Sequence, residues 1–91
     1  MVEWAVEFSP EAEKDLAGLD REVRRRVIDK IEWFRDNFDS VFPSVLSAEL
    51  REFYKLRVGD WRVIYLINWE NNIIKISYID HRSRVYKIKK K

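Results

Sequence analysis

Apolar and polar side chains alternate over residues 2–8, and this alternation predicts a strand with one buried face. Trp4, Val6 and Phe8 share that face, because successive side chains of a strand point to opposite sides. The chain should therefore open with a strand that packs on a core.

The spacing of apolar residues then changes to three or four, which predicts two helices. Ser9 offers an N-cap hydroxyl and Pro10 fits the first helical position, so a short helix should run to about Leu19. Its apolar stripe consists of Ala12, Leu16 and Leu19. Asp20 is expected to cap a second helix. The stripe of that helix consists of Val23, Val27, Ile31, Phe34 and Phe38. The two amphipathic helices form a hairpin in this interpretation.

Residues 39–48 have no period and predict a connecting loop. Beyond it, residues 53–58, 61–69 and 73–80 have the composition of strands. The dipeptides Gly59-Asp60 and Asn71-Asn72 separate these segments, which predicts tight hairpins and a three-stranded antiparallel meander. Residues 81–91 are expected to add one short edge strand and then a frayed tail.

These elements predict an α+β fold with a single domain over residues 1–91. The N-terminal strand, the helical hairpin and the meander should form one sheet with both helices on one face. A chain of 91 residues is long enough for one helix layer on one sheet. The sheet face expected beneath the helices consists of Leu56, Val63, Tyr65, Ile67, Trp69, Ile74, Ile76 and Tyr78. Trp4, Trp33 and Trp69 are all expected to be buried.

The opposite sheet face is expected to carry a row of basic side chains. With two-residue turns, Arg57 lies opposite Arg62, and Arg62 lies opposite His81 on the next strand. Like charges directly opposite one another destabilise a sheet, so a phosphate would relieve their repulsion. The alternative is that the arginines are solvated, or paired with loop carboxylates such as Glu49 or Glu52.

Composition limits the chemistry further. The net charge is +2 and the isoelectric point is about 9.0, with lysine and arginine concentrated near the C-terminus. Because the chain has no cysteine and one histidine, we expect no disulfide, no metal and no cofactor. No stretch is long and apolar enough for a membrane span, and the acidic N-terminus does not have the composition of a signal peptide. A cytoplasmic protein without membrane contact is expected.

The segment FYKLRVGDWRVIY at residues 53–65, followed by IDHRSRVY at residues 79–86, resembles the RelE/ParE toxin superfamily. The expected order of elements is also that of the superfamily, so the resemblance covers nearly the whole chain. It implies the toxin of a type II toxin–antitoxin pair. In RelE-like members the concave sheet face enters the ribosomal A site, where an mRNA 2′-hydroxyl attacks the adjacent phosphate without a metal.

The resemblance also implies a set of functional residues. Those matched to catalytic positions are Arg62, Arg82, Tyr86 and Lys55, and those expected to bind substrate are Arg57, His81, Arg84 and Lys87. Arg62 would stabilise the developing phosphate charge and Arg82 would assist it or the leaving oxygen. Tyr86 would stack on a base or share its proton, although it is equally suited to packing on the sheet edge. Lys55 would hold phosphate or act as the base, with His81 as the competing base.

One position departs from the family pattern. Phe53 stands where the best-studied type of RelE has a lysine, which leaves the route of the proton open. Two alternatives to the ribonuclease therefore remain: a ParE-like inhibitor of DNA gyrase that does no chemistry, and a decayed toxin that acts only as a co-repressor. In every case the resemblance implies a RelB-like antitoxin in a hetero-oligomer, whose acidic, apolar segment covers the basic face. Operator DNA would be reached only through that antitoxin.

Overall fold

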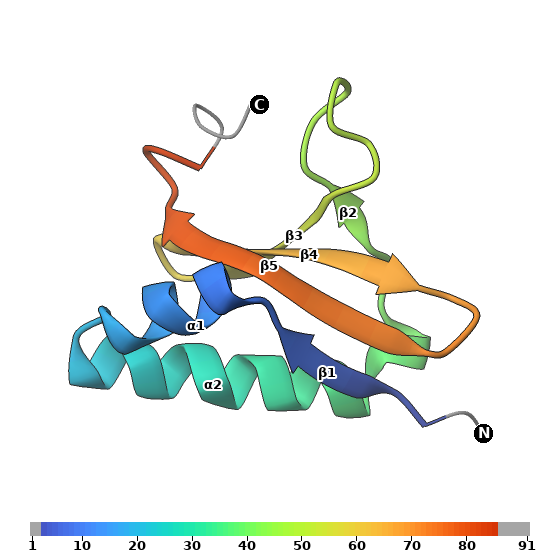
Figure 1. Cartoon of the computed structure of the whole chain (residues 1–91), viewed down its shortest axis with the longest axis horizontal. Coiled ribbons are helices and arrows are strands. Elements are labelled where there is room, and N and C mark those ends of the chain that lie inside the picture. The colour runs from blue at the N-terminus through green and yellow to red at the C-terminus, as the bar shows by residue number, and fades with distance from the viewer. Residues whose placement is uncertain (1–2, 86–91) are drawn as a thin grey trace.

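Two helices cover one face of a five-stranded sheet in the computed structural model, which describes residues 3–85 (Figure 1). The strands are β1 (Ala5–Phe8), β2 (Ser44–Val45), β3 (Tyr54–Val58), β4 (Trp61–Asn68) and β5 (Ile73–His81). The helices are α1 (Pro10–Ala17) and α2 (Arg21–Asp36), followed by a short 3-10 helix, η1 (Phe38–Ser40). The strand order is β1-β5-β4-β3-β2, with β1 parallel to β5 and the other neighbours antiparallel. The expected α+β fold, with one sheet and both helices on one face, is confirmed.

Helix α1 begins where the sequence predicts and is fixed to the sheet. The Ser9 hydroxyl accepts the Ala12 N–H at 3.0 Å and donates to the Ser77 carbonyl at 2.7 Å. The strand β1 ends opposite Ile76, and the next exposed part of β5 is covered by α1. There the Asp15 carboxylate accepts the Ile79 N–H at 2.9 Å. The edge of β5 is thus satisfied by side chains of α1 once its strand partner ends.

Helix α2 also closes the end of α1. The Arg24 guanidinium donates to the carbonyls of Leu16, Ala17 and Leu19 at 3.2, 3.4 and 2.9 Å. A cation at these carbonyls satisfies acceptors that the end of a helix leaves open. Asp20 is the N-cap residue of α2, as expected, but its side chain forms no capping hydrogen bond.

The main core lies between the helices and the sheet. Its fully buried members include Ala12, Val27, Val63, Ile74 and Ile76. Trp4, Val6 and Phe8 of the first strand pack against it, as predicted. Two expectations were wrong: Trp33 is 48% exposed and Trp69 is 61% exposed. Trp33 lies on the border of the α2 stripe, and Trp69 lies beyond the end of β4, where it contacts the edge of Trp4.

The register between β4 and β5 differs from the prediction in two ways. The turn between these strands has four residues rather than two, and Asn72 has a left-handed φ of 57°. In addition, a bulge lies between Ile64 and Tyr65, so that Ile64 faces Tyr78 while Tyr65 faces Ile76. The longer turn shifts the pairing by two residues, which keeps each side chain on its predicted face. The bulge then shifts the pairing by a single residue, so beyond it the β5 side chains exchange faces relative to the prediction. The hairpin at Gly59, where φ is 60°, has the predicted two-residue turn and register.

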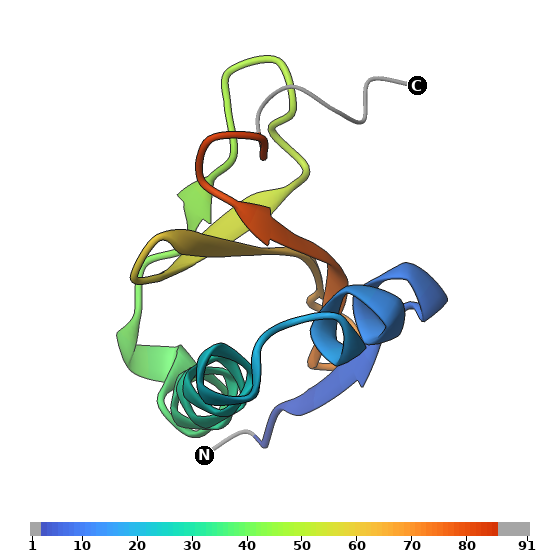
Figure 2. The same cartoon turned by 90° about the vertical axis from the view of Figure 1, so that its left-hand side faces the viewer.

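A second, smaller core lies on the face that the helices leave open. It consists of Leu46, Ile64, Tyr78 and Val85, with Leu50 and Phe53 packed against it. The loop between β2 and β3 and the chain after β5 rise from this face, opposite the helices (Figure 2). Tyr78, expected beneath the helices, lies here because of the bulge. The segment expected to be an unstructured loop contains β2 and part of η1. Residues 82–85 form a turn, and the rest of the segment expected to hold an edge strand and a tail, residues 86–91, lies outside the described residues.

Candidate functional site

Three basic side chains of β3 and β4 share the helix-free face of the sheet. Arg57 lies directly opposite Arg62, as predicted, while Lys55 lies two residues before Arg57 on the same side of its strand. We call these three residues the basic row. Within residues 3–85 Arg57 forms no hydrogen bond or ion pair, and its side chain is exposed. The expected meeting of like charges across β3 and β4 is therefore present.

Arg62 is held in place by the turn that precedes it. Its Nη1 donates to the carbonyls of Gly59 and Trp61, both at 2.9 Å. Its Nε and Nη2 donate to no atom among the described residues. A guanidinium anchored through one nitrogen keeps its remaining donors in a fixed direction, which suits it to bind an anion.

Two aspartates hold the arginines that follow β5. The Asp60 carbonyl accepts the Arg82 N–H at 2.8 Å, and the Asp60 carboxylate lies 3.8 Å from the Arg82 Nε. Both of these side chains are mostly exposed, so the ion pair is weak and leaves Arg82 accessible. Arg84 is bound more closely, since its Nη2 lies 2.8 Å from the Asp80 carboxylate. Asp80 itself lies opposite Arg62, in the place where the sequence predicted His81.

His81 does not belong to the basic row, so the predicted alignment of Arg62 with His81 was wrong. His81 pairs with Trp61, and the two rings meet edge to face at 5.3 Å. The Ser83 N–H donates to the His81 Nδ1 at 3.2 Å, and the Ser83 hydroxyl lies 2.9 Å from the same nitrogen. Because Nδ1 accepts a backbone N–H, neutral His81 carries its proton on Nε2. The outer nitrogen of this ring is thus a donor.

The remaining predicted site residues, Tyr86 and Lys87, lie outside the described residues. Phe53, the departure from the family pattern, packs against the second core. This part of the chain is therefore apolar where a lysine was expected from the family. Tyr65 and Tyr78 keep their phenolic protons and so cannot act as bases: burial, assisted by Asp80, raises the pKa of Tyr78 to about 12, and burial also raises the pKa of Tyr65.

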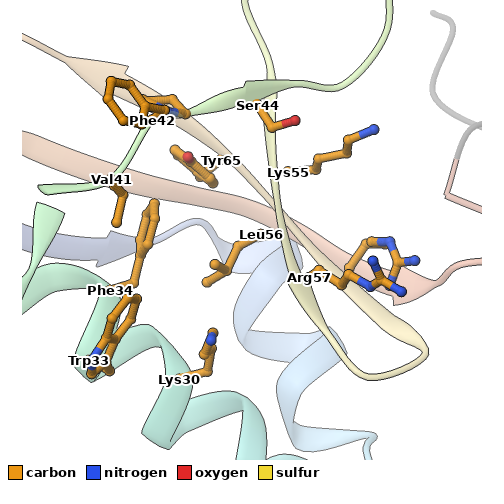
Figure 3. Close-up of a pocket in the computed structure, with 12 residues that line it drawn as sticks. Lys30, Trp33, Phe34, Val41, Phe42, Ser44, Lys55, Leu56, Arg57 and Tyr65 are labelled. Carbon is orange, nitrogen blue, oxygen red and sulfur yellow. The ribbon is translucent and has the colours of Figure 1, made fainter.

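A pocket of about 540 Å³ adjoins the basic row at the edge of the sheet (Figure 3). It lies between α2, the segment before β2, and β3. Lys55, Arg57 and Arg62 line it together with Lys30 of α2. We call it the edge pocket. The cations of the basic row are thus shared between the open sheet face and this hollow.

Sequence reasoning missed the residues that position the arginines and the histidine. Asp60, Asp80 and Ser83 carry out this positioning, and of these only the i,i+4 spacing of Asp80 and Arg84 was a signal in the sequence. Within residues 3–85 no group of three histidine or acidic side chains could hold a metal ion. Over the same range, no helix has the length and apolar character needed to cross a membrane.

Comparison with solved structures defines the class of this fold. A chain of the RelBE2 toxin–antitoxin complex from Mycobacterium tuberculosis is 27% identical, with a TM-score of 0.77, covering 89% of this chain and all (100%) of that one. A chain of the archaeal RelE–RelB complex from Pyrococcus horikoshii is 24% identical, with a TM-score of 0.70 and coverage of 91% and 99%. The isolated Escherichia coli RelE toxin is 19% identical, with a TM-score of 0.68 and coverage of 91% and 90%. The fold is that of the RelE/ParE toxin superfamily.

The family follows from the sequence itself. The model of the ParE toxin of the type II toxin–antitoxin system parDE matches residues 6–86. This chain belongs to that family and is a type II toxin of the RelE/ParE superfamily. No curated protein sequence matches it.

Proposed function

We propose that this toxin is an endoribonuclease that cuts mRNA in the ribosomal A site and uses its own cations in place of a metal. The observation that carries the proposal is the basic row, in which Arg57 and an anchored Arg62 face each other on the open side of the sheet. Two guanidinium groups on directly paired strand positions repel each other until an anion lies between them. An RNA phosphate supplies that anion.

The proposed reaction is an intramolecular transesterification at one phosphate of the RNA strand. The ribose 2′-oxygen forms a bond to the adjacent phosphorus while the bond from phosphorus to the 5′-oxygen breaks, giving a 2′,3′-cyclic phosphate and a 5′-hydroxyl. Arg62, with donors fixed before substrate arrives, stabilises the negative charge that develops on the phosphorane oxygens. Arg82, held near the same turn by Asp60, assists this charge or the leaving oxygen.

The proton steps are assigned by what each side chain can accept or donate. Neutral His81 already carries a proton on Nε2 and lies against Trp61, so it is poorly placed to act as the base. We therefore assign the removal of the 2′-hydroxyl proton to Lys55 of the basic row in its uncharged form, because only the uncharged amine has a lone pair to accept that proton. Tyr86 remains our candidate for the donor to the 5′-oxygen, and Arg84 and Lys87 for contacts to flanking phosphates.

The partner proposed for this toxin is an antitoxin. Chains of similar fold have been crystallised in toxin–antitoxin complexes with RelB. A RelB-like antitoxin with an acidic segment would be drawn to the basic row by complementary charge and would block RNA there. We propose that the toxin acts in the cytoplasm and meets operator DNA only within this hetero-oligomer.

A ribosome-programmed cleavage assay tests the proposal. Purified toxin is added to ribosomes that hold an end-labelled mRNA in the A site. Wild type should cut the message, and a variant with Arg62→Ala and Arg82→Ala together should not. Arg21→Ala is the matched control, because Arg21 is an exposed arginine at the start of α2, away from the basic row. Equal cleavage by wild type and the double variant would refute the site.

A second candidate function is inhibition of DNA gyrase without chemistry. It is favoured by the match to the ParE family and by Phe53, which fills with an apolar ring the place of a family lysine. A supercoiling assay with gyrase and the same preparations distinguishes the two. Intact mRNA on the ribosome together with blocked supercoiling would support this candidate. The decayed toxin would be inactive in both assays.

A further inference from the structure

The edge pocket has features that the cleavage site alone does not explain. Among the described residues that line it, four are cations, namely Lys30, Lys55, Arg57 and Arg62, and none is an aspartate or glutamate. It is also lined by the rings of Trp33, Phe34, Phe42 and Tyr65. A hollow of this size is large enough to hold a small planar ligand. Its lining favours a ligand that is both aromatic and anionic.

Three rings and two of the cations occupy different sides of the edge pocket, while the cation Lys30 lies beside Trp33 on α2. Phe42, Phe34 and Trp33 lie together on the side of α2 and the segment before β2, while Lys55 and Arg57 lie on the side of β3 (Figure 3). One nucleotide has the same division, with a flat base at one end and a phosphate at the other. The ends lie close enough for both to be bound in one hollow.

Two of the four rings that line the pocket, Phe42 and Trp33, are open to solvent, whereas Phe34 and Tyr65 are buried. Phe42 is 95% exposed, and nothing in the main core requires a ring at this position. Trp33 is 48% exposed, and the Lys30 Nζ lies over its ring at 4.8 Å from the centroid. An exposed ring beside a cationic surface is the arrangement that proteins use to bind single-stranded nucleic acid, because bases stack on the ring and the cations bind the phosphates.

We propose that the edge pocket binds one unstacked nucleotide of single-stranded RNA, with its base on the exposed ring of Phe42 and its phosphate on Lys55 and Arg57. This inference rests on the proposed ribonuclease function, since it places a nucleotide that flanks the cleaved bond. Arg57 and Arg62 line the pocket and also belong to the basic row, so one RNA strand passes from one to the other without a gap.

A second pocket adjoins the edge pocket and extends the proposed RNA path along the edge of the sheet. A neighbouring pocket of about 400 Å³ shares Lys30, Trp33 and Arg57 with the edge pocket and adds one cation, Arg26, and one carboxylate, Asp29. An acidic peptide with apolar side chains would match these charges too, but a flat base covers more of the open ring of Phe42 than an aliphatic side chain does. Base stacking uses the open face of such a ring and tolerates any base. RNA is therefore the occupant that the lining favours.

Binding of a noncleavable RNA tests the inference. The probe is a single-stranded hexamer with 2′-O-methyl riboses and one 2-aminopurine, whose fluorescence is quenched when it stacks on an aromatic ring. Phe42→Leu keeps an apolar side chain at this exposed position but removes the ring, so it should weaken binding about tenfold and reduce the quenching. Trp69→Leu is the matched control: Trp69 is 61% exposed and lies outside the pocket, so binding should not change.

The outcomes separate the pocket from the cleavage site. If wild type binds the hexamer and cuts mRNA, and Phe42→Leu binds it equally well with equal quenching, the inference is overturned while the proposed function stands. If wild type neither binds the hexamer nor cuts mRNA, both are overturned. The inference is also overturned if a Glu/Leu peptide of the same charge binds more tightly than RNA and only this peptide is sensitive to Phe42→Leu.

Discussion

The two faces of the sheet differ in the role of their side chains: those of one face stabilise the fold, and those of the other are proposed to bind an anion. The face under α1 and α2 is a continuous apolar core, and the backbone groups that β1 leaves open on β5 are satisfied by Asp15. The opposite face has a small apolar cluster at one part and the basic row at another, where Arg57 faces Arg62. Burial stabilises the first face, whereas charge repulsion weakens the second until an anion binds. Stability and binding are therefore assigned to separate faces, so mutations should affect one without the other.

Replacing Arg62 by lysine should separate the two faces most clearly. Lysine keeps the charge but cannot donate to the Gly59 and Trp61 carbonyls and to a phosphate at the same time. We expect Arg62→Lys to slow single-turnover mRNA cleavage by about 10²-fold, as loss of a preorganised donor does elsewhere. Its thermal unfolding should match that of wild type. Arg21→Lys, a remote exposed arginine, is the control, and unchanged cleavage by Arg62→Lys would contradict the assignment.

Truncating a side chain should lower the free energy of unfolding more in the main core than in the second core. Ile74 is fully buried in the main core, and Ile74→Ala should lower the free energy of unfolding by about 3 kcal/mol. Leu46 is 2% exposed in the second core, which is smaller and able to relax, so Leu46→Ala should cost about 2 kcal/mol. Urea denaturation measures both. Val45→Ala, at an exposed position, should change stability by less than about 0.5 kcal/mol. A larger loss for Leu46→Ala than for Ile74→Ala would overturn the comparison.

Alkaline pH should weaken the fold through its buried phenols. Burial, assisted by Asp80, raises the pKa of Tyr78 from 10.0 to about 12, and the pKa of Tyr65 is also raised. Between these values the unfolded chain loses a proton that the folded chain retains, so the free energy of unfolding falls as pH rises. The contribution is fully present below pH 10 and is lost by about pH 12, at roughly 1–2 kcal/mol for Tyr78. Urea denaturation of wild type and Tyr78→Phe measures it; equal slopes in this window would show that Tyr78 does not contribute.

The smallest expected effect is an increase in the affinity for RNA when the charge of Asp80 is removed. Asp80 lies opposite Arg62 and pairs with Arg84, so it offsets part of the positive charge of this face. Asp80→Asn keeps the oxygen that accepts the His81 N–H but removes the charge. We expect about threefold tighter binding of noncleavable RNA at low salt, with no difference at high salt. Glu32→Gln on α2 is the control with the same change of charge. Weaker binding by Asp80→Asn would mean that Asp80 positions the arginines more than it opposes RNA.

Much of the fold follows from local signals. Ser9 and Pro10 begin α1 as predicted, and the two-residue turn at Gly59 sets the register that brings Arg57 opposite Arg62. These features depend on residues close in sequence, so their pattern is visible without the fold. The class of fold and the two strands of the basic row could therefore be read from the chain.

The rest depends on contacts between distant segments. A bulge at Ile64 and Tyr65 leaves no mark in the sequence, yet it moves Tyr78 to the other face, and together with the four-residue turn after β4 it moves His81 away from Arg62. Two-residue β2 has too few residues to show a period and exists because it pairs with Tyr54 and Lys55. The apolar stripe of a helix also does not show how much of the helix the sheet covers. Trp33, at the border of the α2 stripe, was therefore expected to be buried but is exposed.

The sequence by itself determined which segments become helices and strands, where the Gly59 turn lies, and that arginines occupy one side of two adjacent strands. These follow from side-chain period, capping chemistry and turn geometry, all of which act over a few residues. Only the tertiary structure decided that Asp60 holds Arg82, that Asp80 lies opposite Arg62, and that α2 and β3 enclose the edge pocket. These depend on register and on the placing of one layer against another, where a shift of one residue exchanges the two faces.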